Sequence, residues 1–138
     1  MFPTPSEKEK PVYDILICDD EDAVRGLVEE IVRTEGFSFL SARSGKEAFG
    51  KAMENEFRLI LMDMKMPDDW DGLTAIRSME FCNENRRVIV VSAWLDDKMK
   101  QDLSEERNVI GWIEKPFDPA KLVSMIRLGL GQPLPGTD

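Results

Sequence analysis

Short, wholly apolar runs along the chain alternate with longer segments in which apolar residues recur every three or four positions. Because the runs are continuous and of strand length, they predict strands that are buried on both faces of a sheet. The recurring segments predict amphipathic helices. The pattern predicts five strands, at residues 13–18, 37–41, 59–62, 88–92 and 109–113, with a helix after each of them.

Apolar stripes and local start and stop signals define the predicted helices. Gly36 ends the first helix. Ser44, with Glu47 three residues later, forms a capping box at the start of the second. Asp118 caps the last helix, and Pro119 takes its first position. The stripes are Val24, Leu27, Val28, Ile31 and Val32; Ala48, Phe49, Ala52 and Met53; Leu73, Ile76 and Met79; Met99 and Leu103 in a mostly polar helix over 96–106; and Leu122, Met125 and Ile126.

Strict alternation of strands and helices predicts an α/β fold with a parallel sheet and right-handed crossovers. The chain has 138 residues, enough for one domain with a real core. We expect that domain at residues 12–130. A polar tail with three prolines is expected at 1–11, and a C-terminal tail or the start of a linker at 131–138.

Composition narrows the classes of function. A net charge of −9 argues against direct binding to nucleic acid or to an anionic membrane, both of which need a basic face. The apolar runs are too short to cross a membrane, and the N-terminus does not resemble a signal peptide. We therefore expect a cytoplasmic protein in which Cys18 and Cys82 are reduced and buried. The chain has no histidine, so a metal site would have to hold a hard cation through oxygen atoms.

Charged and polar residues stand where the predicted strands end. Asp19–Glu21 follow the first strand, Asp63 the third, Ser92 ends the fourth and Lys115 follows the fifth. Each of them alone is most often a helix cap, a turn residue or part of a solvated loop. Ligands of open α/β sheets bind beyond these strand ends, however, and clustered carboxylates need a cation such as Mg²⁺. A carboxylate can also act as a nucleophile and form an aspartyl phosphate.

Together these residues resemble the receiver domain of two-component response regulators, over about residues 12–130. The resemblance implies a (βα)5 flavodoxin-like fold with helices on both faces of a sheet in the order 2-1-3-4-5. It also implies that Asp63 is the phosphoacceptor. Asp19, Asp20, Asp63 and the backbone carbonyl of Lys65 would hold Mg²⁺, which Mn²⁺ can replace.

The resemblance extends to residues around the acceptor. Ser92 and Lys115 would bind the phosphoryl group, and Ser92 and Trp112 would act as the switch. Lys65 and Trp94 would control the access of water to the phosphoryl group. Two alternatives stay open: an aromatic residue in a strand such as Trp112 is often simply part of the core, and Trp94 can instead pack on the fourth helix.

Two further details of the resemblance concern loops of this chain. Pro116 follows Lys115, where the family often has a cis peptide bond. The loop at 66–72 is one residue longer than the family pattern of Met-Pro, two residues and Asp-Gly. We interpret Asp68 and Asp69 in this loop as solvated turn residues.

The implied function is that of a signalling switch rather than an enzyme, with only autocatalytic phosphoryl acceptance and slow self-dephosphorylation. A histidine kinase or histidine phosphotransfer protein would donate the phosphoryl group, since the chain has no histidine. Phosphorylation would change the face formed by the fourth helix, the fifth strand and the fifth helix. That face would control an output partner or a fused effector domain, and dimerisation through it is common in the family.

Three other functions would also use some of these residues. A phosphatase of the haloacid dehalogenase class needs a second aspartate two residues after the nucleophile, where this chain has Lys65. A flavodoxin-like cofactor binder needs a Ser/Thr/Gly-rich phosphate loop, where this chain has Asp19–Glu21. The third is a receiver that serves as an interaction module without phosphorylation, and the intact set of site residues argues against it.

Overall fold

The structure, a computed structural model, describes residues 10–80 and 86–131. Cys82 and most of the two predicted tails lie outside the described residues. Cys18 is a buried free thiol, as expected, and burial raises its pKa. None of the described helices is long and apolar enough to span a membrane.

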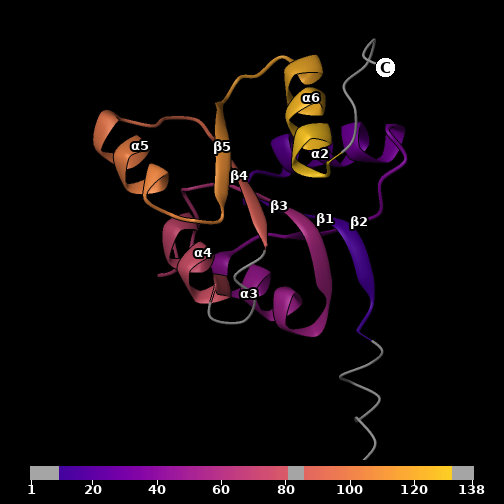
Figure 1. The fold of residues 1–138 in the computed structure, drawn as a ribbon, viewed down its shortest axis with the longest axis horizontal. Coiled ribbons are helices and arrows are strands. Elements are labelled where there is room, and N and C mark those ends of the chain that lie inside the picture. Colours follow the sequence, from indigo (N-terminus) through magenta and orange to yellow (C-terminus); the bar gives the residue numbers. More distant parts are fainter. Residues whose placement is uncertain (1–9, 81–85, 132–138) are drawn as a thin grey trace, which may run out of the picture.

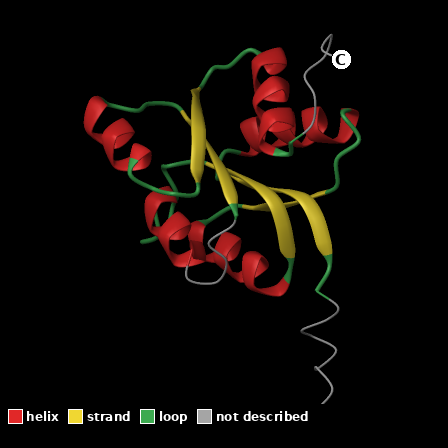
Figure 2. Cartoon of the chain, viewed as in Figure 1, coloured by secondary structure: helices red, strands yellow, loops and turns green. Residues whose placement is uncertain are grey.

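Strands and helices alternate through the described chain, as the apolar pattern predicts (Figure 1). Figure 2 shows the same view coloured by type of element. The elements are β1 (Val12–Cys18), α2 (Asp22–Thr34), β2 (Phe39–Ala42), α3 (Gly45–Glu54), β3 (Glu56–Met62), α4 (Gly72–Glu80), β4 (Arg87–Ser92), α5 (Asp97–Ser104), β5 (Val109–Glu114) and α6 (Pro119–Gly129).

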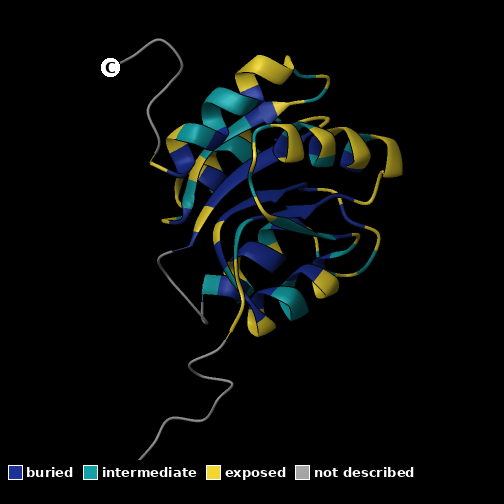
Figure 3. Cartoon of the chain, turned by 90° about the vertical axis from the view of Figure 1, so that its right-hand side faces the viewer, coloured by how far each residue is buried: buried dark blue, intermediate teal, exposed yellow. Residues whose placement is uncertain are grey.

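The described strands form one parallel sheet in the order β2-β1-β3-β4-β5, which confirms the predicted fold class. Helices α2 and α6 cover one face, while α3, α4 and α5 cover the other (Figure 1). The sheet therefore lies between two helical layers, and its central strands β1, β3 and β4 are more deeply buried than the edge strands β2 and β5 (Figure 3). Successive residues of β3 show this directly, because Ile60 packs in one core cluster and Leu61 in the other.

Three details of the elements differ from the prediction. β3 begins at Glu56, earlier than expected, because its first residues alternate between buried Phe57 and exposed Arg58 and so lack a continuous apolar run. β2 begins later than expected because the Phe37 N–H donates to the Val32 carbonyl at the end of α2, at 3.1 Å. Leu27 and Met53, which stand at the margins of their stripes, are exposed rather than buried.

The helix boundaries follow the predicted caps. The Ser44 hydroxyl accepts a hydrogen bond from the Glu47 N–H at 3.1 Å, and the Asp118 carboxylate accepts one from the Ala120 N–H at 3.0 Å. Gly36 has a φ of 83°, which suits the chain reversal after α2. Each side-chain cap contributes about 1 kcal/mol to stability.

The long loop at 66–72 packs against the start of α3. The Asp68 carboxylate accepts hydrogen bonds from the N–H groups of Lys46, at 3.1 Å, and Trp70, at 3.2 Å. The Trp70 ring lies 5.2 Å from that of Phe49 on α3, between centroids. Asp68 is therefore a partly exposed turn residue, as interpreted, and its carboxylate also accepts from a free N–H group at the start of α3. Asp69 is exposed.

Two glycines of α3 test this packing. A Cβ at Gly45 would lie 2.6 Å from the Trp70 Cβ and closer still to the Trp70 carbonyl oxygen, whereas a Cβ at Gly50 would meet nothing within 4 Å. We predict that Gly45→Ala lowers the free energy of unfolding by about 1–3 kcal/mol through overpacking. The matched control Gly50→Ala should raise it by about 0.5–1 kcal/mol through helix propensity. Urea unfolding of both variants measures these changes, and a Gly45→Ala variant as stable as wild type would contradict the packing.

Candidate functional site

The carboxyl ends of β1, β3 and β4 open onto a cavity of about 600 Å³. Because parallel strands end at the same edge of a sheet, residues far apart in the sequence meet there. The cavity wall includes Asp20, Asp63, Lys65, Ser92 and Trp94, all of which the sequence singled out. The structure therefore brings most of the predicted site residues to one place.

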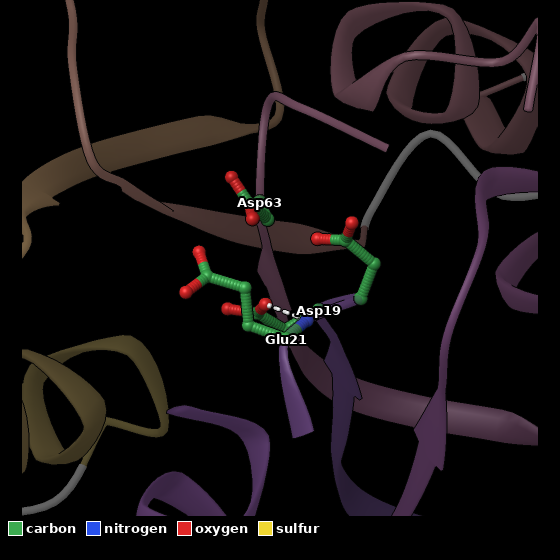
Figure 4. Close-up of side chains that lie close together, drawn as sticks. Asp19, Glu21 and Asp63 are labelled. Carbon is green, nitrogen blue, oxygen red and sulfur yellow. Dashed lines mark hydrogen bonds between the residues drawn. The ribbon is translucent and has the colours of Figure 1, made fainter. Parts of the chain in front are cut away.

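Four carboxylates gather at the ends of β1 and β3. Oxygen atoms of Asp19, Asp20, Glu21 and Asp63 all lie within 4.8 Å of one another. Figure 4 shows Asp19, Glu21 and Asp63 directed toward a common space, with a hydrogen bond of 2.9 Å from the Glu21 N–H to Asp19 Oδ1. Asp19 and Asp63 are each only 3% exposed, whereas Asp20 and Glu21 reach solvent.

Asp63 is held at the end of β3 by groups on both sides. Its N–H donates to the Cys18 carbonyl at 3.0 Å, which continues the pairing of β1 and β3. Its Oδ1 accepts from the Lys65 N–H at 3.2 Å, and its Oδ2 accepts from the Lys115 ammonium at 3.1 Å. Burial raises the pKa of Asp63, and the hydrogen bond from Lys65 and the charge of Lys115 only partly offset this. A cation added to the site would favour its charged form.

Lys115 supplies the positive charge that keeps these carboxylates together. Its Nζ lies 2.7 Å from Asp19 Oδ2, 3.1 Å from Asp63 Oδ2 and 3.4 Å from Glu21 Oε1. Burial alone lowers the pKa of Lys115, but the hydrogen bond to Asp19 and the charges of Asp63 and Asp19 outweigh it, so the pKa is raised. The peptide bond from Lys115 to Pro116 is cis, as the resemblance suggests.

Of the other predicted residues, Ser92 and Trp94 line the cavity and Trp112 does not. Ser92 is buried at the end of β4, and its carbonyl accepts from the Lys115 N–H at 2.8 Å. Trp94 is 68% exposed and lines the cavity, as does Met99 of α5. Trp112 does not line this cavity. It is half-buried against the core on the side of α3, α4 and α5.

Two acidic residues of the site received no role from the sequence. Glu21 follows Asp19 and Asp20 in the same turn, and this run of acidic residues could have identified it as part of the site. Asp71 lines the cavity and also caps α4, where its carboxylate accepts from the Thr74 N–H at 2.8 Å. Its spacing ahead of Gly72 indicates a helix start, but only the folded loop places it at the cavity.

The donor set suits a hard divalent cation. Its oxygens come from carboxylates on two strand ends, and Mg²⁺ prefers a few carboxylates together with water. The buried ammonium of Lys115 lies between Asp19 and Asp63, which shows that these two carboxylates accept a cation in common. The residues present therefore fit Mg²⁺.

The sequence as a whole matches a known family. The sequence model of the response regulator receiver domain matches residues 15–127. This chain belongs to that family. It is 35% identical over 104 residues to sporulation initiation phosphotransferase F of Bacillus subtilis (strain 168), and the match covers 75% of this chain and 82% of that protein.

A second relative places the receiver domain within a longer protein. The transcriptional regulatory protein SrrA of Staphylococcus aureus (strain NCTC 8325 / PS 47) is 30% identical over 114 residues. The match covers 83% of this chain but only 46% of SrrA. The receiver domain thus spans about half the length of that relative.

Solved structures agree with the family assignment. The receiver domain protein (CheY-like) of Methanospirillum hungatei JF-1 matches with a TM-score of 0.80 and 25% identity, over 87% of this chain and 94% of that chain. The response regulator protein TrrA of Thermotoga maritima, solved in complex with Mg²⁺–BeF, matches with a TM-score of 0.76 and 25% identity, over 86% of this chain and 99% of that chain. The predicted resemblance is confirmed.

Proposed function

We propose that this receiver domain accepts a phosphoryl group on Asp63 from a phosphohistidine of a partner protein. The observation that carries the proposal is the Asp63 carboxylate itself, which is held at a cavity by Lys115 among three further carboxylates. Asp19, Asp20, Asp63 and the Lys65 carbonyl would hold Mg²⁺. The related TrrA structure, a complex with Mg²⁺–BeF, supports the choice of metal.

The chemical step transfers the phosphoryl group from a histidine nitrogen of the partner to a carboxylate oxygen of Asp63. One carboxylate oxygen of Asp63 forms the new P–O bond while the P–N bond of the partner's phosphohistidine breaks. The electron pair of that bond stays with the imidazole nitrogen, which takes up a proton from water. Bound Mg²⁺, or Mn²⁺ in its place, supplies positive charge that stabilises the transferring phosphoryl oxygens.

Lys115 and Ser92 would hold the product. Once Asp63 is phosphorylated, the Lys115 ammonium remains close enough to pair with a phosphoryl oxygen. The Ser92 hydroxyl, buried at the same edge of the sheet, is the second donor. In this role the domain would be a phosphoacceptor with only autocatalytic phosphoryl acceptance and slow self-dephosphorylation, rather than an enzyme.

The output would arise from a change around Ser92. Phosphorylation adds charge of about −1.5 to −2 and strong hydrogen-bond acceptors at Asp63. Movement of Ser92 toward the phosphoryl group would open space that half-buried Trp112 could enter, which biases a two-state equilibrium of α5, β5 and α6. That face would control an output partner or a fused effector domain, and it could also serve dimerisation.

The phosphoryl donor would be a histidine kinase or a histidine phosphotransfer protein. The chain contains no histidine, so the donor histidine comes from elsewhere. The similarity to a protein named as a phosphotransferase supports a role in a two-component system or phosphorelay.

The first experiment asks whether Asp63 takes up phosphate. Incubation with Mg²⁺ and acetyl phosphate should add one phosphoryl group to the intact mass of the wild type. The addition should be absent from Asp63→Asn and absent when the metal is chelated. Phosphorylation that persists in Asp63→Asn would contradict the assignment of the acceptor. No addition in the wild type, with acetyl phosphate and with a phosphorylated histidine phosphotransfer protein, would favour the interaction-module alternative.

Trp94 and Lys65 at the cavity rim would slow the entry of water. We predict that Trp94→Ala speeds the decay of the phosphorylated protein about five-fold, which corresponds to about 1 kcal/mol in the barrier. The matched control is Leu128→Ala, which also removes an exposed large apolar side chain. Leu128 lies at the end of α6, and the carbonyl of its neighbour Gly129 accepts from Arg87 at the start of β4, whereas Trp94 follows the end of that strand. The decay is followed by intact mass after the donor is removed, and equal lifetimes for wild type and Trp94→Ala would rule out this role.

A further inference from the structure

Arg25 on α2 is a buried cation next to the turn that follows β1 and carries Asp19, Asp20 and Glu21. Its side chain is 8% exposed. Nη1 donates a hydrogen bond of 3.0 Å to the backbone carbonyl of Asp19, and Nη2 contacts the carboxylate of Asp22 at 2.5 Å. A charged side chain is rarely buried unless it is paired and hydrogen-bonded. Here one of the hydrogen bonds goes to the backbone of Asp19, a residue of the carboxylate cluster.

A second arginine of the same helix shows what an ordinary ion pair looks like. Arg33 pairs with Glu30 at 2.8 Å with the same spacing of three residues, but its side chain is 60% exposed. Such a surface pair contributes at most about 1 kcal/mol and needs no burial. The features that distinguish Arg25 are therefore its burial and its bond to Asp19, and helix stabilisation accounts for neither.

Arg25 holds both sides of the turn that follows β1. Its guanidinium binds the Asp19 carbonyl, and its own N–H donates to the Glu21 carbonyl at 2.8 Å. With that carbonyl bound, each polar group of Asp19 has a partner: the N–H donates to Ala42, Oδ1 accepts from Glu21 and Oδ2 pairs with Lys115. The turn cannot rotate without breaking several of these contacts.

The turn matters because it carries three of the four clustered carboxylates, those of Asp19, Asp20 and Glu21. These groups repel one another, and the repulsion favours a more open turn. Contacts that fix the ligands of a metal without touching the metal commonly change its affinity 10- to 100-fold. A backbone clamp at Asp19 is such a contact.

We propose that Arg25 is a positioning residue: it clamps the Asp19 carbonyl so that the β1–α2 turn presents its carboxylates to a divalent cation. The proposal rests on the Mg²⁺ site of the proposed function. If so, Arg25 raises the affinity of the site for a cation, although its positive charge alone would lower that affinity. Removing a nearby positive charge would by itself strengthen the binding of a cation, whereas loss of the clamp weakens it.

The test is calorimetric titration of the full chain with MgCl₂ at constant ionic strength. Arg25→Met should raise the dissociation constant for Mg²⁺ about ten-fold or more. Arg33→Met is the matched control and should change it less than two-fold. Asp22→Asn removes the ion pair but leaves the guanidinium–carbonyl bond in place, so it should also stay within two-fold of the wild type.

Arg25→Lys separates charge from geometry and serves if Arg25→Met does not fold, which circular dichroism reports. Lysine keeps the charge but has one nitrogen in place of the guanidinium fork, so the dissociation constant should stay several-fold above that of the wild type. Equal affinities of the wild type and the Arg25 variants would overturn the inference, as would an Asp22→Asn effect as large as that of Arg25→Met. A wild type that binds no Mg²⁺ would instead overturn the proposed metal site, and the inference with it.

Discussion

The buried pairing of Asp19, Asp63 and Lys115 is the interaction on which the rest of the site depends. Two carboxylates at the ends of neighbouring strands are both nearly inaccessible to water, and such a pair is costly unless a cation lies between them. Lys115 provides that cation from β5, two strands away from β3. It reaches across the end of β4, where its N–H is fixed by the Ser92 carbonyl. The strand order therefore sets which residues can meet.

Contacts with the neighbouring helices hold the loops at this edge of the sheet. Strands buried on both faces leave little freedom to the residues that follow them, and the loop after β3 is fixed to α3 through Asp68 and Trp70. The turn after β1 is fixed in a similar way through Arg25. Both segments that carry the clustered carboxylates are thus connected to helices.

Much of the fold could be predicted because it depends on local patterns. Continuous apolar runs identified the strands, and Ser44, Asp118 and Gly36 marked helix ends through interactions with near neighbours in the sequence. The features that the sequence did not reveal have tertiary causes. The Asp68 carboxylate accepts from the Lys46 N–H, more than twenty residues away on α3, and Phe57 is buried although its neighbours Glu56 and Arg58 give no apolar run.

The site, like the fold, could be predicted only in part. Asp19, Asp63 and Lys115 could be named because strand ends share an edge and because the family resemblance gave each of them a role. The closeness of Glu21 to Lys115 depends on the path of a turn, which the sequence does not define. Arg25 could not have been distinguished from Arg33 in the sequence, since each has an acidic residue three positions earlier. Its burial and its bond to the Asp19 carbonyl separate the two in the structure.

Urea unfolding with and without Mg²⁺ shows whether the strand-end carboxylates form a divalent cation site. A cation that binds only the folded state raises the free energy of unfolding by RT ln(1 + [Mg²⁺]/Kd). The wild type should gain stability with MgCl₂ beyond what NaCl of equal ionic strength provides, and Asp19→Asn should lose most of this gain. A wild type that responds equally to both salts would argue against a divalent cation site.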